Sequence, residues 1–350
     1  MKGGIWVFCV VSVFSLRAWA GAVSNAARPF PLRRSFEFTY HVEVTHLPIG
    51  AHDVRIWIPV ARTDRHQRVS LIKVTGSVPS RLTREPEYGD RMLYAEIRSP
   101  RSSTAEFTLL YHVTRWQYSK GSYSQLLRYN NDPAPPLASL RLYLEPNRMI
   151  PIGGEMKAIA EQVTRGEHGP VQIAHAAYTY LFDTMRYDKS GTGWGRGDAV
   201  WACNAKHGNC TDFHSAFIGI LRNEKVPARF VIGFPLPPNA SQGVIPGYHC
   251  WAEFYVSPVG WVPVDISEAW LDKKLYHYYF GTVDANRVRF SAGRDITLVP
   301  KQAGRPINFF VYPYVEVDGK PFHQVQDRFT FKDLSGGGRQ ASLPARGPSS

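Results

Sequence analysis

Regular alternation of apolar and polar residues dominates the first third of the chain and limits the folds open to it. Five short segments between Phe36 and Tyr118 alternate with a period of two, and turns rich in Pro, Gly, Asp and Arg separate them. They are FEFTYHVEV, DVRIWIPV, RVSLIKVTG, RMLYAEIRS and AEFTLLYHVTRW. Such alternation is typical of strands that bury one face. The pattern predicts an antiparallel β-sandwich domain over residues 31–130.

The pattern changes after NDPAPP, residues 131–136, where Asn, Asp and three prolines stop the alternation and predict a linker. Two segments with helical spacing follow, GEMKAIAEQVTRG and PVQIAHAAYTYLFDTMRY. The Gly-rich stretch DKSGTGWGRGDAVWA is expected to be a loop. A further apolar helix precedes the predicted strands ARFVIGF, YHCWAEFYV, GWVPVDIS and FFVYPYVEV. Residues 145–332 therefore form a second, α+β domain, and the tail 336–350 is expected to be disordered.

The first twenty residues have the features of a secretory signal peptide. Lys2 precedes an apolar stretch from Ile5 to Leu16, and Ala18 and Ala20 flank Trp19 in the small-x-small pattern of a cleavage site. The apolar stretch is shorter than the roughly 20 residues that a membrane-spanning helix needs. We expect cleavage after Ala20 and export of the protein to the periplasm or the exterior.

The chain is basic, with 41 Lys and Arg against 29 Asp and Glu and a formal net charge of +12. Loss of the leader removes Lys2 and Arg17 and no acid, which leaves about +10. This balance favours anionic surroundings such as an envelope polymer or lipid headgroups, and a purely solubilising charge is the alternative. We find no nucleic-acid-binding motif. The oligomeric state is left open.

The stretch HGNCTDFHSAF, residues 207–217, carries the strongest chemical signal. Asn209 can cap the helix that follows, and Asp212, three residues later, completes a capping box. Cys210 then occupies the first helical position, where the partial positive charge of the helix start stabilises a thiolate. Its own backbone N–H is placed to donate to the oxyanion that forms when a thiolate adds to a carbonyl.

A nucleophilic thiolate also needs an imidazole and a group that orients it. Alternation in YHCWAEFYV puts His249 and Glu253 on one strand face and Cys250 on the other. If GWVPVDIS returns as a hairpin, a three-residue loop or a bulge near Gly260 puts Asp265 on the His249 face, whereas an unbulged four-residue loop does not.

The segments GNCTDFHSAFIGILRNEKVPARFVIGF, GYHCWAEFYV and GWVPVDIS together resemble the core of the transglutaminase-like superfamily, which includes bacterial peptidases and transamidases. The resemblance covers roughly residues 174–267, and the downstream sequence is similar to an exported bacterial branch. It implies a papain-like α+β core in which a helix packs on an antiparallel sheet. Carried over residue by residue, the nucleophile falls on Cys210, the general base on His249 and the orienting acid on Asp265.

The chain departs from the usual family pattern at two places. Cys250 stands where family members commonly have Ala, and Ile266 and Ser267 stand where they commonly have Pro and Thr. The resemblance also implies a second oxyanion donor from an upstream side chain. Trp194, Trp201 and Tyr187 are the candidates.

The cysteines and histidines allow other interpretations. Cys203, His207, Cys210 and His214 have a spacing that could hold zinc. Cys203 and Cys250 could instead form a disulfide that leaves Cys210 free, and two buried reduced thiols are the alternative. His214 is expected to be a packing residue, and Glu253 ranks below Asp265 as the group that orients His249.

The sequence thus predicts a thiol enzyme that acts on peptide or amide bonds through an acyl-enzyme, without a metal or organic cofactor. Its partner would be a protein or peptide substrate. Hydrolysis is expected over crosslinking, since water is the default acceptor. Arylamine acetyltransferases, which share the order Cys, His, Asp, are an enzymatic alternative. A binding or scaffolding module for cell-envelope polymer, without catalysis, is an alternative of another class.

Overall fold

The computed structural model describes residues 30–131 and 138–334. The predicted signal peptide, all but the first residue of the predicted linker, and the predicted disordered tail lie outside the described residues. Within the described part of the chain, no helix is long and apolar enough to span a membrane.

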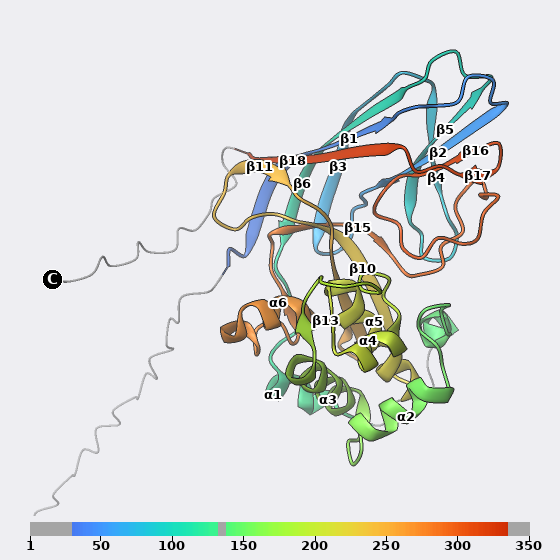
Figure 1. Ribbon diagram of the computed structural model, residues 1–350. Helices are drawn as coiled ribbons and strands as arrows, with labels where there is room; N and C mark the ends of the chain where they lie inside the picture. Colours follow the sequence, from blue (N-terminus) through green and yellow to red (C-terminus); the bar gives the residue numbers. More distant parts are fainter. Residues whose placement is uncertain (1–29, 132–137, 335–350) are drawn as a thin grey trace, which may run out of the picture. The chain divides into compact units, whose positions relative to one another are not determined.

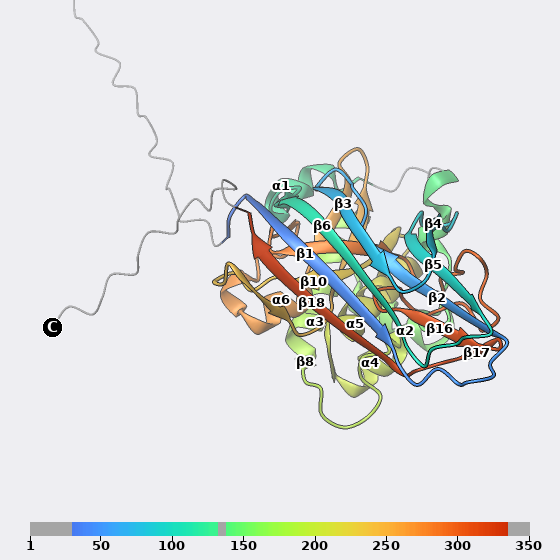
Figure 2. The ribbon, with the colours of Figure 1, turned by 90° about the horizontal axis from the view of Figure 1, so that it is seen from above.

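Two five-stranded sheets contain the alternating segments. The first has the order β11-β18-β1-β6-β3, and Figure 2 shows β18, β1, β6 and β3 side by side. The second has the order β17-β16-β2-β5-β4. Their strands are β1 (Arg33–Val44), β2 (Asp53–Val60), β3 (Gln67–Gly76), β4 (Ser80–Arg84), β5 (Arg91–Arg98), β6 (Ala105–Trp116), β11 (Gln242–Ile245), β16 (Tyr314–Val317), β17 (Lys320–Pro321) and β18 (Val325–Asp333). All pairings in both sheets are antiparallel.

The two sheets bury their alternating apolar faces in one cluster. Every second residue of β1 from Phe36 to Val44 is buried, and so are Val54, Ile56 and Ile58 of β2. These side chains belong to a single hydrophobic core. The strand-rich N-terminal region that the alternation predicts is therefore present.

Strands from the C-terminal part of the chain complete both sheets. β18 covers one edge of β1, and β16 pairs with β2. Pairing with these strands satisfies backbone groups that would otherwise remain open at a sheet edge. As a result, the described residues lie in one compact unit by their contacts.

A third sheet, of order β13-β12-β10-β15, carries the helices. Its strands are β10 (Ala228–Pro235), β12 (His249–Val256), β13 (Gly260–Val264) and β15 (Arg287–Ala292). The helix α5 (Cys210–Asn223) packs on this sheet, with the rings of Phe217 and Phe254 in contact. Figure 1 shows α2 (Gly154–Val163), α3 (Gly169–Thr184) and α4 (Ala199–Ala205) gathered around α5. The predicted core, a helix packed on an antiparallel sheet, is confirmed.

The remaining elements are short. They are β7 (Tyr118–Ser119), α1 (Tyr123–Leu126), η1 (Leu127–Tyr129), η2 (Ala138–Leu144), β8 (Arg186–Tyr187), β9 (His207–Gly208), α6 (Ile266–Leu271), η3 (Lys273–Leu275) and β14 (Thr282–Val283).

Two local predictions need correction. The Gly-rich stretch is a loop only as far as Asp198, whose side chain accepts a hydrogen bond from the backbone N–H of Trp201 and starts α4. The predicted strand FFVYPYVEV is shorter than expected, because pairing with β2 begins only at Tyr314, directly after Pro313.

The hairpin register agrees with one of the two alternatives. Val256 pairs with Gly260, so the loop between β12 and β13 has three residues, 257–259. Asp265 then follows the last residue of β13, on the His249 face of the hairpin. This register brings residues 249 and 265 to the same end of the sheet.

Gly233 lies opposite His249 in the pairing of β10 with β12, so the position of His249 depends on how β10 packs. A Cβ at residue 233 would lie 1.8 Å from the carbonyl oxygen of Val288 in β15. We expect Gly233→Ala to lower the free energy of unfolding by about 1–3 kcal/mol, the usual cost of overpacking. Urea unfolding would measure it.

Gly247→Ala is the matched control, since a Cβ there meets only an ordinary contact, 3.5 Å from the hydroxyl of Tyr312. Equal stability of the two variants would contradict the close approach of β15 to Gly233.

Candidate active site

The start of α5 is fixed by the predicted capping box. The side chain of Asn209 accepts a hydrogen bond from the backbone N–H of Thr211 at 2.9 Å, and Asp212 accepts from the N–H of Asn209 at 2.9 Å. Asp212 also accepts from the N–H groups of Gly195 and Gly197, at 2.7 and 2.9 Å. One buried carboxylate therefore holds both the helix start at Cys210 and the Gly-rich loop.

His249 lies at the start of β12 and joins the other two predicted site residues. Its Nε2 is 2.7 Å from Oδ2 of Asp265. Its ring is also close enough to Cys210 to lower the pKa of the thiol. Since Asp265 occupies Nε2, Nδ1 is the ring nitrogen left for sulfur. Asp265 caps α6, where its side chain accepts from the N–H of Glu268. The structure thus brings Cys210, His249 and Asp265 together from three segments.

Electrostatics favour charged forms of all three groups. Burial opposes ionisation of Asp265, but the positive charges of His249 and Arg287 hold its pKa below the ordinary value. Burial likewise disfavours a charged His249, yet Asp265 and Cys210 raise its pKa well above the ordinary value. Burial would raise the pKa of Cys210, but hydrogen bonds from Cys250 and His249 bring it well below the ordinary value. A thiolate–imidazolium pair follows.

His214 makes hydrogen bonds with the backbone of two segments that carry the site. Its Nδ1 is 2.8 Å from the carbonyl oxygen of Cys210, and its Nε2 accepts a hydrogen bond from the backbone N–H of Ile266 at 3.1 Å. Burial lowers the pKa of His214 to about 4, so the ring is neutral near pH 7. It joins the first turn of α5 to the start of α6.

The sequence allowed either a disulfide between Cys203 and Cys250 or two buried reduced thiols, and the structure agrees with the second. Cys203, Cys210 and Cys250 are all free and buried, which agrees with the alternative of buried reduced thiols and not with a disulfide between Cys203 and Cys250. The sulfur of Cys250 lies 3.8 Å from Oγ1 of Thr211 and 3.7 Å from Nδ1 of His214. Burial and the neighbouring Cys210 raise the pKa of Cys250 well above its ordinary value. It therefore remains a thiol, and it donates to Oγ1 of Thr211.

The proposed zinc ligands do not come together. Both ring nitrogens of His214 are engaged with backbone groups, and His207 Nδ1 is 3.5 Å from the carbonyl oxygen of Asp188. Among residues 30–131 and 138–334, no group of three or more His, Cys, Asp or Glu is arranged to hold a metal ion.

Of the three candidate oxyanion donors, Tyr187 lies near the thiol. Burial, and then the charge of Cys210, raise the pKa of its phenol. Trp201 instead lies against Gly193 and the ring of His207.

Sequence reasoning missed Tyr248. Its hydroxyl lies 2.8 Å from Oγ1 of Thr211 and accepts from the amide of Asn209 at 3.0 Å. Its ring packs against Phe309 and Tyr312, with ring centroids 5.6 and 5.8 Å apart. The side chain thus lies over the start of α5.

Arg287 was also missed, although its guanidinium contacts the orienting carboxylate directly. It donates to Asp265 at 2.8 Å and to Asp284 at 2.5 Å, and it is almost fully buried. No motif signals this role, because residue 287 comes from β15, well after the matched segments.

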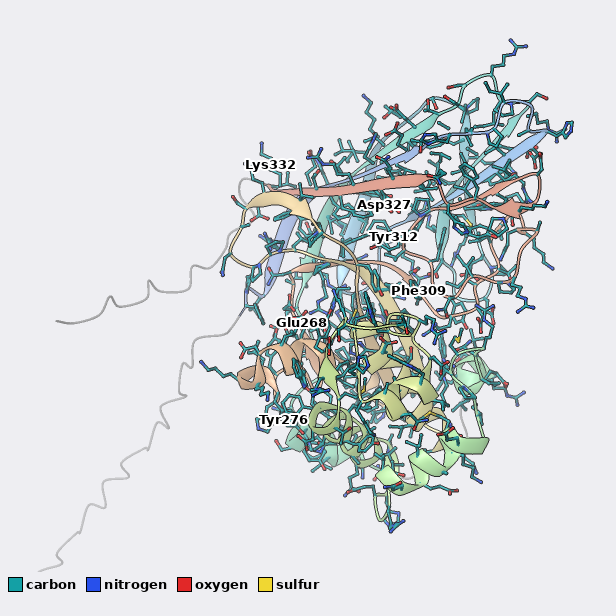
Figure 3. The ribbon with its side chains drawn as sticks, in the orientation of Figure 1. Glu268, Tyr276, Phe309, Tyr312, Asp327 and Lys332 are labelled. Carbon is teal, nitrogen blue, oxygen red and sulfur yellow. The ribbon has the colours of Figure 1, made fainter. Side chains whose placement is uncertain are left out.

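A cavity of about 280 Å³ opens beside His249. Its lining includes Glu268, Tyr279 and Arg287. Figure 3 labels Glu268 on α6, at the side of the third sheet. Cys210 itself is only 2% exposed, so a substrate carbonyl can reach the sulfur only when neighbouring groups move.

Comparisons with known proteins agree with this geometry. Residues 157–266 match the model of the transglutaminase-like superfamily. An uncharacterized protein of Haemophilus influenzae is 27% identical over 329 residues, which are 82% of this chain and 87% of that protein.

A solved structure from Cytophaga hutchinsonii, of a protein provisionally assigned as a cysteine protease, shares the fold. It has a TM-score of 0.56 and 14% identity over 89% of this chain and 96% of that chain. Residues 157–266 belong to the transglutaminase-like superfamily, as the sequence resemblance predicts.

The ionisation of Cys210 provides a test of the ion pair. Because its pKa is lowered, the thiolate should persist through neutral pH and disappear only in acid, whereas an ordinary thiol protonates below about pH 8.5. The ultraviolet absorbance of the thiolate, taken as wild type minus Cys210→Ser, would report it. In His249→Ala the midpoint should move up towards the ordinary value, since the partner cation is lost. A wild-type midpoint at or above the ordinary value would contradict the pair.

Proposed function

We propose that this protein is a thiol enzyme that cleaves peptide or amide bonds through Cys210, His249 and Asp265. The observation that supports the proposal most is the position of His249, whose Nε2 lies 2.7 Å from Asp265 and whose ring and the Cys210 thiol shift each other's pKa towards the charged forms. This is the arrangement that an activated nucleophile requires.

In the first half of the reaction, the Cys210 thiolate attacks the carbonyl carbon and the C–O π electrons move to oxygen. The backbone N–H of Cys210, at the first position of α5, stabilises the oxyanion. We place Tyr187 as the second donor, because its environment includes Cys210. The His249 imidazolium then protonates the leaving amine as the C–N bond breaks, which leaves a thioester and a neutral imidazole.

In the second half, neutral His249 removes a proton from water, and the resulting hydroxide attacks the thioester carbon. The C–S bond breaks, the acid product leaves, and the Cys210 thiolate and the imidazolium re-form. An amine in place of water would give transamidation. We favour water, since crosslinking needs a site that excludes it.

Asp265 acts through His249. Its carboxylate fixes the ring with Nε2 towards itself and stabilises the imidazolium. Arg287 in turn keeps that carboxylate ionised and in place. Arg287 is therefore a positioning residue in this scheme.

A protein or peptide of an exported compartment is the substrate that we propose. The predicted leader and the basic composition support this setting. The cavity beside His249 supplies space for substrate next to the reacting atoms. Since Cys210 is buried, displacement of the neighbouring aromatic residues precedes attack.

Digestion of an unbiased peptide library, analysed by mass spectrometry, tests the proposal. Cys210→Ala and His249→Ala should each lower cleavage by a factor of about 1000 or more, and Asp265→Asn by a smaller but still large factor. Cys203→Ala is the control, because Cys203 is buried in α4 and its thiol, with a pKa raised by burial to about 11, has no part in the scheme.

The non-catalytic alternative makes the opposite prediction. In the wild type it expects neither cleavage nor amine incorporation over a range of pH, and alkylation of Cys210 no faster than in denatured protein. Rapid alkylation that slows in His249→Ala favours the enzyme.

A further inference from the structure

A second cavity, of about 500 Å³, is lined by different residues from the candidate active site. Its cationic side chains are Arg62, Arg65, Arg115, Lys120, Arg229 and Arg289. Asp64 and Glu253 are the carboxylates in its lining. We call it the basic pocket. Its volume falls within the range of about 300–1000 Å³ that is usual for small-molecule sites.

The two carboxylates already have partners in the protein. Glu253 accepts from Arg229 at 2.5 Å, and Asp64 accepts from Nη1 of Arg289 at 3.2 Å. Burial alone would raise the pKa of Glu253, but Arg229 and then Arg289 hold it below the ordinary value. Both acids also act on Arg115, and Asp90, outside the lining, lies 4.0 Å from Arg62, but the six cations of the lining still outnumber its two carboxylates.

Several buried donors of the basic pocket have no acceptor. Nε of Arg115, Nε and Nη2 of Arg289, and Nε1 of Trp251 are buried without a hydrogen-bond partner among the described residues. Arg115 is 1% exposed and Arg289 is 4% exposed. Leaving one such donor unsatisfied costs about 1–3 kcal/mol, and more for a charged group.

Arg115 stays charged despite its burial. Desolvation lowers the pKa of Arg115 only to about 10, which leaves the guanidinium protonated near neutral pH. His66 adds no charge there, because burial and Arg115 lower its pKa to about 4. The excess of positive charge in the lining therefore comes from Arg and Lys.

We propose that the basic pocket is a binding site for a small molecule that carries a carboxylate or phosphate group. The planar guanidinium groups of Arg115 and Arg289 match the geometry of such oxyanions, and the indole N–H of Trp251 adds a neutral donor. These four atoms are themselves buried, so an oxyanion that enters the pocket reaches them as the side chains turn towards it, and it then supplies the acceptors that they lack. A cavity of this size also has room for the body of a ligand beyond one anionic group.

The basic pocket is separate from the candidate active site, and the proposal of oxyanion binding does not rest on the proposed catalysis. Trp251 lines the pocket, and the guanidinium carbon of Arg115 lies 5.8 Å from its ring. The guanidinium of Arg287, which donates to Asp265, lies 5.1 Å from the same ring. Neither Cys210 nor His249 lines the pocket, so Cys210→Ala should bind anions as the wild type does.

Isothermal titration of the full-length protein with inorganic phosphate, and separately with citrate, tests the proposal, with sodium chloride used to match ionic strength. We expect saturable one-to-one binding of at least one probe. Arg289→Gln should weaken it at least tenfold. Arg68→Gln should leave it unchanged, because Arg68 is an exposed arginine of β3 outside the lining.

If Arg289→Gln does not fold, Arg65→Gln combined with Lys120→Gln replaces it, since these cations are exposed or partly exposed. Preference for phosphate or for citrate identifies which oxyanion the site takes. The proposal is overturned if neither probe binds with a Kd below about 10 mM. It is also overturned if the pocket variants bind as tightly as Arg68→Gln.

Discussion

The buried carboxylate of Asp265 is the group on which the candidate site depends. It contacts His249 at 2.7 Å, Arg287 at 2.8 Å and the hydroxyl of Ser267 at 3.2 Å, and it is fully buried. An isolated buried charge is very costly, so these contacts must form together as the chain folds. They join the end of β13, the starts of β12 and β15, and the first turn of α6. One carboxylate therefore both organises the fold and orients the imidazole.

The residues around Cys210 explain how its buried thiol can stay reactive. His249 and Cys250 both lower the pKa of the Cys210 thiol, and the Cys250 thiol donates to Oγ1 of Thr211. Neutral His214 holds the carbonyl of Cys210 at the same helix start. Opposite charges alternate from the Cys210 thiolate through His249 and Asp265 to Arg287. In a site with little water, such alternation stabilises each charge through its neighbours. Cys250, the departure from the usual family residue, thereby contributes a hydrogen bond that Ala cannot make.

Local sequence patterns predicted much of this structure because local physics determines it. The capping box of Asn209 and Asp212 and the helix start at Cys210 follow from spacing. The sequence left two hairpin registers open, and the structure has the one that puts Asp265 on the His249 face. Arg287, Tyr248 and the return of β18 to β1 could not be predicted, because contacts distant in sequence determine them. The pairing of Cys203 and Cys250 was left open for the same reason, since spacing does not show that Cys250 packs against His214.

The protonation state of His249 is the most direct test of the account. Nitrogen-15 NMR of histidine-labelled protein at neutral pH should show both ring nitrogens of His249 protonated, because Asp265 and the Cys210 thiolate hold its pKa well above the ordinary value. In Cys210→Ala the pKa of His249 should be lower than in the wild type, because the thiolate is lost. A neutral His249 ring in the wild type at neutral pH, with only one nitrogen protonated, would contradict the thiolate–imidazolium pair.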